Sequence, residues 1–177
     1  VQLPEMPDSP LTTIAILLNQ TFRRDEMLEK EFIRVSAIVS DEGKLSERAT
    51  VEGATGGWAR KIEALNSIIE ELARPTTEVA RVMRAVAAGD LSQKVTVTAK
   101  GEILEVKDTM NTMVDTLRSF ASEVTRVAKE VGTEGRLGVQ ADVKGVFGTW
   151  KNLTDNVNSM ASNLTVQLRD VSKVATA

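Results

Sequence analysis

The amino-acid sequence predicts an all-α protein built from tandem helix–connector–helix repeats. Two observations support this prediction. Apolar residues recur over long stretches with the 3-4 spacing that is typical of amphipathic helices. A glycine-led tetrapeptide interrupts that spacing three times, at Gly43, Gly89 and Gly135, and successive copies are 46 residues apart. A fixed period of this size indicates a repeat architecture.

The composition excludes several classes of function. The 177 residues contain no Cys and no His, so disulfides, thiolate chemistry and the commonest general base are absent. A net charge of -3 gives no electrostatic signature of nucleic-acid binding. No catalytic constellation, metal site or cofactor site can be assembled from the remaining residues, and we expect the segment not to be an enzyme.

The apolar stretches are also too short for a membrane. Leu11 to Leu18 is the longest, well below the roughly 20 residues that a spanning helix requires. We therefore expect no direct membrane insertion and a cytoplasmic location.

The repeats divide the chain in a regular way. Three of the four prolines lie within residues 1–10, which predicts an extended lead-in. The predicted segments that follow are an N-terminal helix at 11–27, a first repeat at 28–73, a second repeat at 74–117, a third repeat at 118–168, and the start of a further helix or repeat at 169–177.

Each of the three glycines stands where a helical pattern stops, and we predict that it ends the helix with a positive φ. The connectors that follow carry apolar residues at matching positions. A floppy linker, the alternative interpretation, would not repeat these residues at one step through three copies. We therefore predict ordered connectors whose apolar side chains dock onto the helices, the main ones being Leu45, Leu91, Val95 and Leu137.

The clearest helical pattern follows the second connector, where apolar residues are spaced 3-4-3-4 through successive heptads. One helix cannot bury such a seam alone, so the pattern predicts a helical bundle. The predicted core positions on this helix are Ile103, Val106, Met110, Met113, Leu117, Phe120 and Val124. Pro75 lies inside the preceding helical pattern, where we expect it to kink or restart the helix at a boundary between repeats.

Asparagine recurs at equivalent places in all three repeats, tryptophan in the first and third, and one glutamate is found in the second repeat alone. The asparagines Asn66, Asn111 and Asn158 either hydrogen-bond the connector backbone or form ordinary polar surface. Trp58 and Trp150 are interpreted as anchors that pack a connector against its bundle, with a ligand platform as the alternative. The second repeat has Glu102 near the start of its second helix, as a cap or as a tie to the neighbouring helix.

The stretch from Pro75 to Leu117 resembles a HAMP domain, the signal-relay module of sensor kinases and chemoreceptors. The resemblance is carried by Pro75, Gly89-x-Leu91, Val95, Glu102-Ile103 and Met110-Asn111-Thr112-Met113. The first and third repeats resemble divergent HAMP units, since Trp58 and Trp150 replace Ile103 and neither repeat matches Glu102. Their alternation with the regular unit resembles the poly-HAMP array of group III hybrid histidine kinases, the osmosensing kinases of fungi, and their bacterial relatives.

This resemblance implies stacked parallel four-helix coiled-coil bundles formed by a homodimer. It also implies a relay of conformational change, within a two-component system, to adjacent HAMP or kinase domains of the same chain. Two rival functions remain: a passive coiled-coil spacer for dimerisation, and the relay segment of a chemoreceptor.

Overall fold

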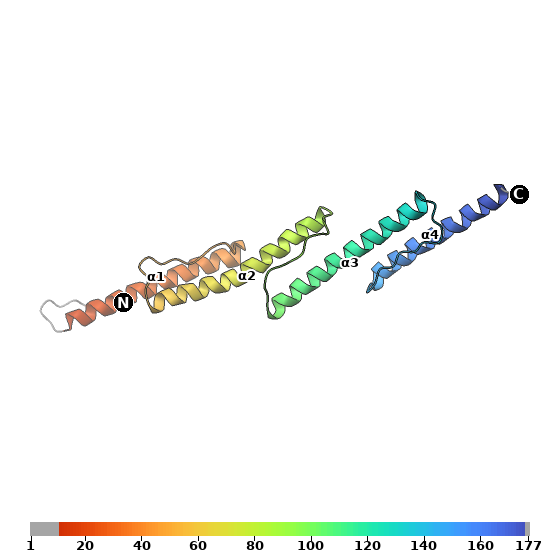
Figure 1. Ribbon diagram of the computed structural model, residues 1–177. Helices are drawn as coiled ribbons and strands as arrows, with labels where there is room; N and C mark the ends of the chain where they lie inside the picture. Colours follow the sequence, from red (N-terminus) through yellow and green to blue (C-terminus); the bar gives the residue numbers. More distant parts are fainter. Residues whose placement is uncertain (1–10, 176–177) are drawn as a thin grey trace. The chain divides into compact units, whose positions relative to one another are not determined.

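The computed structural model describes residues 11–175, and this part of the chain is all-α, as the sequence predicts. It consists of four long helices, α1 (Thr12–Glu42), α2 (Gly57–Ala87), α3 (Gly101–Gly132) and α4 (Gly148–Ala175) (Figure 1). The predicted lead-in at residues 1–10 lies outside the described residues. Over its described length, no helix combines the length and the apolar character needed to cross a bilayer.

Extended connectors at residues 43–56, 88–100 and 133–147 join successive helices. Each connector runs back beside the helix it leaves before the next helix starts (Figure 1). Two successive helices therefore point in the same direction where they share a connector. This parallel pairing requires a long connector, because a tight turn would reverse the chain.

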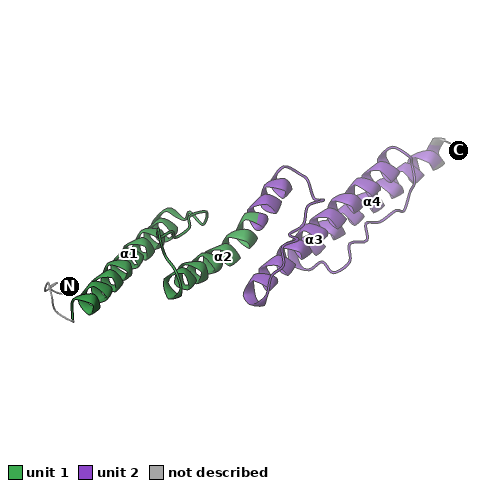
Figure 2. Cartoon of the chain, turned by 60° about the vertical axis from the view of Figure 1, so that its left-hand side comes forward, with its two compact units in different colours: residues 1–77 green, residues 78–177 purple. Residues whose placement is uncertain are grey.

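The chain divides into two compact units, residues 1–77 and 78–177, with the division inside α2 (Figure 2). Helix α2 continues through Pro75 and does not restart there, which corrects the sequence expectation of a new helix start. Pro75 lacks an N–H, so one backbone bond of the helix is missing at this turn. The hydroxyl of Thr76 donates to the carbonyls of Leu72 and Ala73 at 2.8 and 2.9 Å in the same turn.

Three small apolar cores lie along the described residues, and each contains one buried connector residue. Ala49, Val95 and Ala141 are 1%, 2% and 6% exposed, and they recur at the 46-residue step. Each packs with buried residues of the two helices that flank its connector. The other buried members are Leu28, Val35, Ile62 and Ile69 in the first core, Val82, Met110 and Val114 in the second, and Val127, Val131 and Ala161 in the third.

The predicted core positions of α3 are only partly buried within one chain. Met110 is buried, and Ile103, Leu117, Phe120 and Val124 are half-buried. Val106 and Met113 are 53% and 40% exposed, so neither belongs to a core of the single chain. Their place in the core of a two-chain bundle stays a prediction. Val114, which the heptad pattern did not select, is fully buried. A helix buries one stripe against its neighbours, and Val114 lies in the stripe of Met110, one turn further along.

The glycines of the repeated tetrapeptide all have a positive φ, at 66° for Gly43, 83° for Gly89 and 66° for Gly135. In each case the next residue donates its N–H back to a helix carbonyl. The bonds run from Lys44 to Ile38 at 3.4 Å, from Asp90 to Ala85 at 2.9 Å and from Arg136 to Glu130 at 2.8 Å. This pattern satisfies carbonyls that a helix end otherwise leaves unpaired. Gly43 is the C-cap of α1, whereas α3 ends at Gly132 with Thr133 as its C-cap, so the prediction that Gly135 ends this helix is wrong.

Candidate functional site: a repeated clamp on each connector

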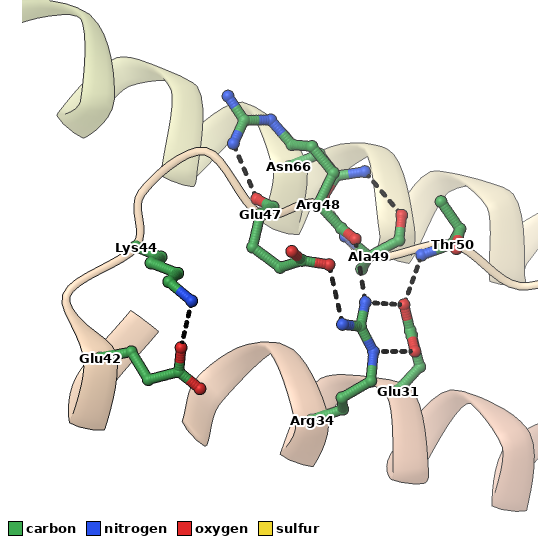
Figure 3. A network of polar contacts seen from close by, with 9 residues as sticks. All are labelled: Glu31, Arg34, Glu42, Lys44, Glu47, Arg48, Ala49, Thr50 and Asn66. Atoms are coloured by element: carbon green, nitrogen blue, oxygen red, sulfur yellow. Dashed lines mark hydrogen bonds and ion pairs between the residues drawn. The ribbon is translucent and has the colours of Figure 1, made fainter. Parts of the chain in front are cut away.

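The first connector is held on one side by an ion pair of α1 (Figure 3). Glu31 and Arg34 are one turn apart and pair through two bonds, each of 2.8 Å. Arg34 Nη2 also donates to the backbone carbonyl of Arg48 at 3.2 Å. Oε1 of Glu31 accepts the backbone N–H of Thr50 at 2.7 Å. The ion pair on the helix therefore hydrogen-bonds one backbone carbonyl and one backbone N–H of the extended connector.

Helix α2 holds the same connector from the other side. Asn66 Oδ1 accepts the N–H of Ala49 at 2.8 Å, and Asn66 Nδ2 donates to the Ala49 carbonyl at 2.9 Å. One side-chain amide therefore satisfies both backbone groups of a fully buried residue, as a neighbouring strand would. We call this arrangement, a Glu–Arg pair on the first helix and an Asn on the second, the connector clamp.

The ion-pair side of the clamp recurs at the second connector. Arg81 Nε and Nη2 donate to Glu78 at 3.1 and 2.9 Å. Arg81 Nη2 donates to the carbonyl of Lys94 at 3.0 Å. The Thr96 backbone N–H makes a minor contribution to lowering the pKa of Glu78. The ion pair and its bond to the connector carbonyl correspond to those at the first connector.

The third connector has the same contacts again. Arg126 Nε and Nη2 donate to Glu123 at 3.1 and 2.7 Å, and Nη2 also donates to the Gln140 carbonyl at 2.7 Å. Glu123 Oε2 accepts the backbone N–H of Asp142 at 2.9 Å. The clamp is therefore a feature of all three repeats, including the two divergent ones.

The asparagine side is equally regular. Asn111 accepts the N–H of Val95 at 2.9 Å and donates to its carbonyl at 3.0 Å. Asn158 accepts the N–H of Ala141 at 2.7 Å and donates to its carbonyl at 3.1 Å. Of the two interpretations that the sequence left open for the asparagines, the geometry corresponds to the first, hydrogen bonding to the connector backbone.

The clamp carboxylates are stabilised in their charged form. The hydrogen bond from Arg34, reinforced by the Thr50 N–H, lowers the pKa of Glu31 to about 2 against the partial burial that opposes it. Arg126 and the Asp142 N–H lower the pKa of Glu123 to about 2 in the same way. The pKa of Glu78 is also lowered, chiefly by Arg81. All three clamps are therefore ion pairs at neutral pH.

The third partner of the arginine differs between repeats. Arg34 Nη1 contacts Glu47 at 2.7 Å and Arg126 Nη1 contacts Glu130 at 3.4 Å, whereas Arg81 Nη1 contacts the amide oxygen of Gln93 at 2.9 Å. The side chains of Arg34 and Glu47 are 42% and 34% exposed. An exposed pair of this kind contributes about 0–1 kcal/mol, so the bidentate pair and the backbone bonds dominate each clamp.

Sequence reasoning did not assign a role to the glutamate–arginine pairs. The signal was present, because Glu-x-x-Arg occurs at 31–34, 78–81 and 123–126, with each arginine 8 or 9 residues before its connector glycine. A spacing of three places both side chains on one face of a helix. A pair of this kind on a helix surface is ordinarily interpreted as solvent-exposed charge. Only the tertiary structure places the connector backbone next to it.

The two tryptophans lie in different surroundings. Trp58 packs against the first apolar core, which includes Ala49 of the first connector, and its Nε1 donates to Asp25 Oδ1 of α1 at 2.7 Å. Trp150 is 37% exposed and meets Phe120 of α3 edge to face, with ring centroids 5.5 Å apart. Trp58 thus has the contacts of the predicted anchor, while the ring contact of Trp150 is with a helix and not with a connector.

Two predicted roles have no counterpart within the single chain. Glu102 is exposed in the first turn of α3, and the N-cap residue Lys100 makes no side-chain cap bond. No tie from Glu102 to a neighbouring helix is found in the described residues, although the positive end of the helix dipole favours an acid there. Leu137 is 38% exposed and does not dock like the half-buried Leu45 and Leu91. Gly138 follows it with a φ of 86° and donates to Thr165 Oγ1 at 3.0 Å, which gives this connector a different path.

Parallel helices joined by clamped connectors define an all-α protein of tandem helix–connector–helix units. Residues 53–119 match the family described as "HAMP domain", so the chain contains a HAMP domain, a signal-relay module. The match begins within the first connector and includes the whole second connector with its clamp.

A distant relative is the methyl-accepting chemotaxis protein McpB of Pseudomonas aeruginosa. It is 25% identical over 113 residues, which cover 64% of this chain and 17% of that protein. The chain therefore corresponds to a small part of this relative's length. No solved structure matches the chain.

Proposed function

We propose that the chain is the relay segment of a chemoreceptor-type protein, passing a conformational change along stacked HAMP repeats of a parallel homodimer to an output region outside these residues. The HAMP match and the similarity to a methyl-accepting chemotaxis protein support this proposal. Neither of them names a kinase, so the chemoreceptor alternative is favoured over the histidine kinase output and the osmosensing role that the sequence resemblance suggested.

The proposal of a dimer is supported by a set of apolar side chains that are exposed to solvent in the single chain. They occupy seam positions on three helices, where a second copy aligned in parallel would cover them. Their exposed fractions range from 40% to 60%, and they are Ile68 and Leu72 on α2, Val106 and Met113 on α3, and Leu153, Met160 and Leu164 on α4.

The relay itself is supported by the continuity of the helices. Helix α3 runs without interruption from Gly101 to Gly132, leaving the second connector and entering the third. A continuous helix transmits rotation or axial displacement because it has no loop at which to yield. Two bundle packings of similar free energy would make such a helix a switch.

Sedimentation equilibrium tests the dimer. We expect the wild-type chain to be a dimer, and Met113→Glu combined with Met160→Glu to shift it to a monomer because two charges would enter the seam. Ser122→Glu is the matched control, since Ser122 is an exposed residue away from the seam of α3. A monomeric wild-type chain, or a dimer that tolerates both seam charges, would contradict the proposal.

The output is tested on the full-length protein. Incubation with a chemotaxis methyltransferase and S-adenosylmethionine should label glutamyl side chains outside this segment, and incubation with ATP should give no autophosphorylation. Autophosphorylation without methylation would replace the chemoreceptor by the kinase. A Met113→Cys cross-link across the dimer should change with stimulus, and an unchanged cross-link would favour a passive spacer.

A further inference from the structure

One position near the start of the second helix of each repeat alternates between tryptophan and isoleucine. Trp58 stands there in the first repeat, Ile103 in the second and Trp150 in the third, at steps of 45 and 47 residues. The asparagines of the clamps have the same two steps, which establishes the correspondence. The bidentate ion pair and the asparagine bonds are alike in all three clamps, and only the exposed third partner of the arginine alternates. The residue near the start of the second helix alternates as well, and its contacts with the first helix differ between repeats.

Trp58 joins α2 directly to α1. Its indole N–H donates to Asp25 at 2.7 Å, and the guanidinium carbon of Arg24 lies 5.4 Å from the ring centroid. The ring also packs on the first apolar core. A hydrogen bond to a carboxylate and a cation over the ring both depend on position, so they restrict sliding or rotation of one helix against the other.

Trp150 joins α4 directly to α3 by another contact. Its ring meets Phe120 with centroids 5.5 Å apart and planes inclined by 64°. This edge-to-face geometry is one that aromatic pairs prefer, and it is lost when one ring moves along or around its helix. The first and third repeats thus each have a direct contact from the tryptophan of the second helix to a side chain of the first helix, although the two contacts differ in kind.

The second repeat has no equivalent contact in the described residues. Among the hydrogen bonds, ion pairs and ring contacts of residues 78–117, none joins α2 directly to α3. These helices are joined through the connector and through the core of Val82, Met110 and Val114. The sequence counterparts of Asp25 and Phe120 are Leu72 and Pro75, which offer neither a carboxylate nor an aromatic ring.

We infer that Trp58 and Trp150 pin the two helices of the first and third repeats to each other, and that the helix pair of the second repeat is the one that shifts. The inference rests on the proposed relay function and adds to it the place where the movement occurs. Apolar contacts without directional partners permit small displacements at little cost, whereas a hydrogen bond or an edge-to-face ring pair does not. The alternation of the repeats then separates one movable joint from two fixed ones.

Distances between spin labels within one chain test this inference. The 177 residues contain no Cys, so labels attach only at introduced cysteines. Equivalent exposed positions on the first and second helices supply one label pair for each repeat: Ala37 with Ala64, Arg84 with Thr109, and Lys129 with Asn156. Labelled chains are mixed with an excess of unlabelled chains, so that only distances within one chain are recorded.

We expect narrow distance distributions in the first and third repeats and a distribution about twofold broader, or double-peaked, in the second. Trp58→Ile should broaden the Ala37–Ala64 distribution to the width of the second repeat and leave Lys129–Asn156 unchanged. Trp150→Ile should do the reverse. Asp25→Asn, which keeps an oxygen acceptor for the indole, is the matched control and should leave the first distribution narrow, while Asp25→Leu should broaden it.

The reciprocal exchange covers the case in which Trp58→Ile fails to fold. Leu72→Asp with Ile103→Trp puts the residue types of Asp25 and Trp58 at the equivalent sequence positions of the second repeat. A bond between them should narrow the Arg84–Thr109 distribution. Equal widths in all three wild-type repeats would overturn the inference, as would a folded exchange variant that does not narrow. Because the distances lie within one chain, the result is independent of dimerisation and of the methylation test, so either proposal can fail without the other.

Discussion

Asn111 and Glu123 stand on the same helix and hold different connectors. Asn111 brackets Val95 of the second connector, and Glu123 accepts the N–H of Asp142 in the third. Twelve residues separate them, and the same interval separates Asn66 from Glu78. Twelve helical residues rise about 18 Å, so α3 fixes both the spacing and the relative direction of its two connectors.

Removing a clamp asparagine should destabilise the protein. Asn158→Ala leaves the N–H and carbonyl of the buried Ala141 without partners, which should cost about 1–3 kcal/mol. Asn156→Ala, two residues earlier on the same helix and exposed, should change stability by less than about 0.5 kcal/mol. Urea unfolding followed by circular dichroism measures both, and equal losses would show that the bracket contributes nothing.

Replacing a clamp arginine by lysine should also weaken a connector, despite the conserved charge. Arg126→Lys cannot maintain two bonds to Glu123 together with one to the Gln140 carbonyl, and we expect a loss of about 1–2 kcal/mol. Arg136→Lys is the control, since Arg136 is 66% exposed and makes one ion pair at 3.4 Å. Amide exchange at Asp142 should accelerate only in the Arg126 variant. Unchanged exchange there would count against the clamp.

Acid should loosen the clamps in a defined window. The pKa of Glu31 and of Glu123 is about 2 in the folded chain, below the ordinary value of 4.5. A depressed pKa means that the stabilisation is complete above pH 4.5 and is lost as the pH falls toward 2, by about 2 kcal/mol for each carboxylate. The variant Glu31→Gln with Glu123→Gln should be less stable at pH 7 and lose less between pH 4.5 and 2. Parallel pH profiles for wild type and variant would refute this assignment.

The glycine that ends α2 should be sensitive to a side chain for conformational reasons alone. Gly89 has a φ of 83°, and a Cβ built there meets no atom within 4 Å. Gly89→Ala should therefore cost about 1–2 kcal/mol through backbone strain without any clash, and Gly89→Val more. Gly132→Ala, at the helical end of α3 and equally open, should be neutral or slightly stabilising. Equal melting temperatures for the two alanine variants would contradict the claim that the positive φ of Gly89 makes a side chain unfavourable there.

Much of the fold could be read from the sequence because it depends on local physics repeated at one step. The helices follow from apolar spacing, and their ends follow from glycines such as Gly89 that adopt positive φ. The buried connector residue Val95 was predicted as an apolar side chain that docks onto the helices. The asparagines were recognised as recurrent, although their bonds to the connector could not be distinguished from surface exposure.

Other features depended on how neighbouring segments approach. The heptad pattern selects Met113 as core, yet the connector side of α3 buries Val114 and leaves Met113 in water. A pattern gives the angular position of a residue on its helix but not which of two adjacent apolar stripes meets the connector. For the same reason Leu137 could not be known to be exposed, since Gly138 redirects the backbone beside it.

By itself, the sequence determined an all-α chain of repeated helices, the glycines that end them and the asparagines that mark them. Those features arise from the preferences of each residue for its own backbone and from the helical period. Only the tertiary structure decided that Glu31, Arg34 and their counterparts hydrogen-bond the connectors. It also decided that Trp58 and Trp150 contact different partners. A side chain on a helix surface acquires such a role only when a distant backbone segment arrives within hydrogen-bonding distance, and no local preference encodes that arrival.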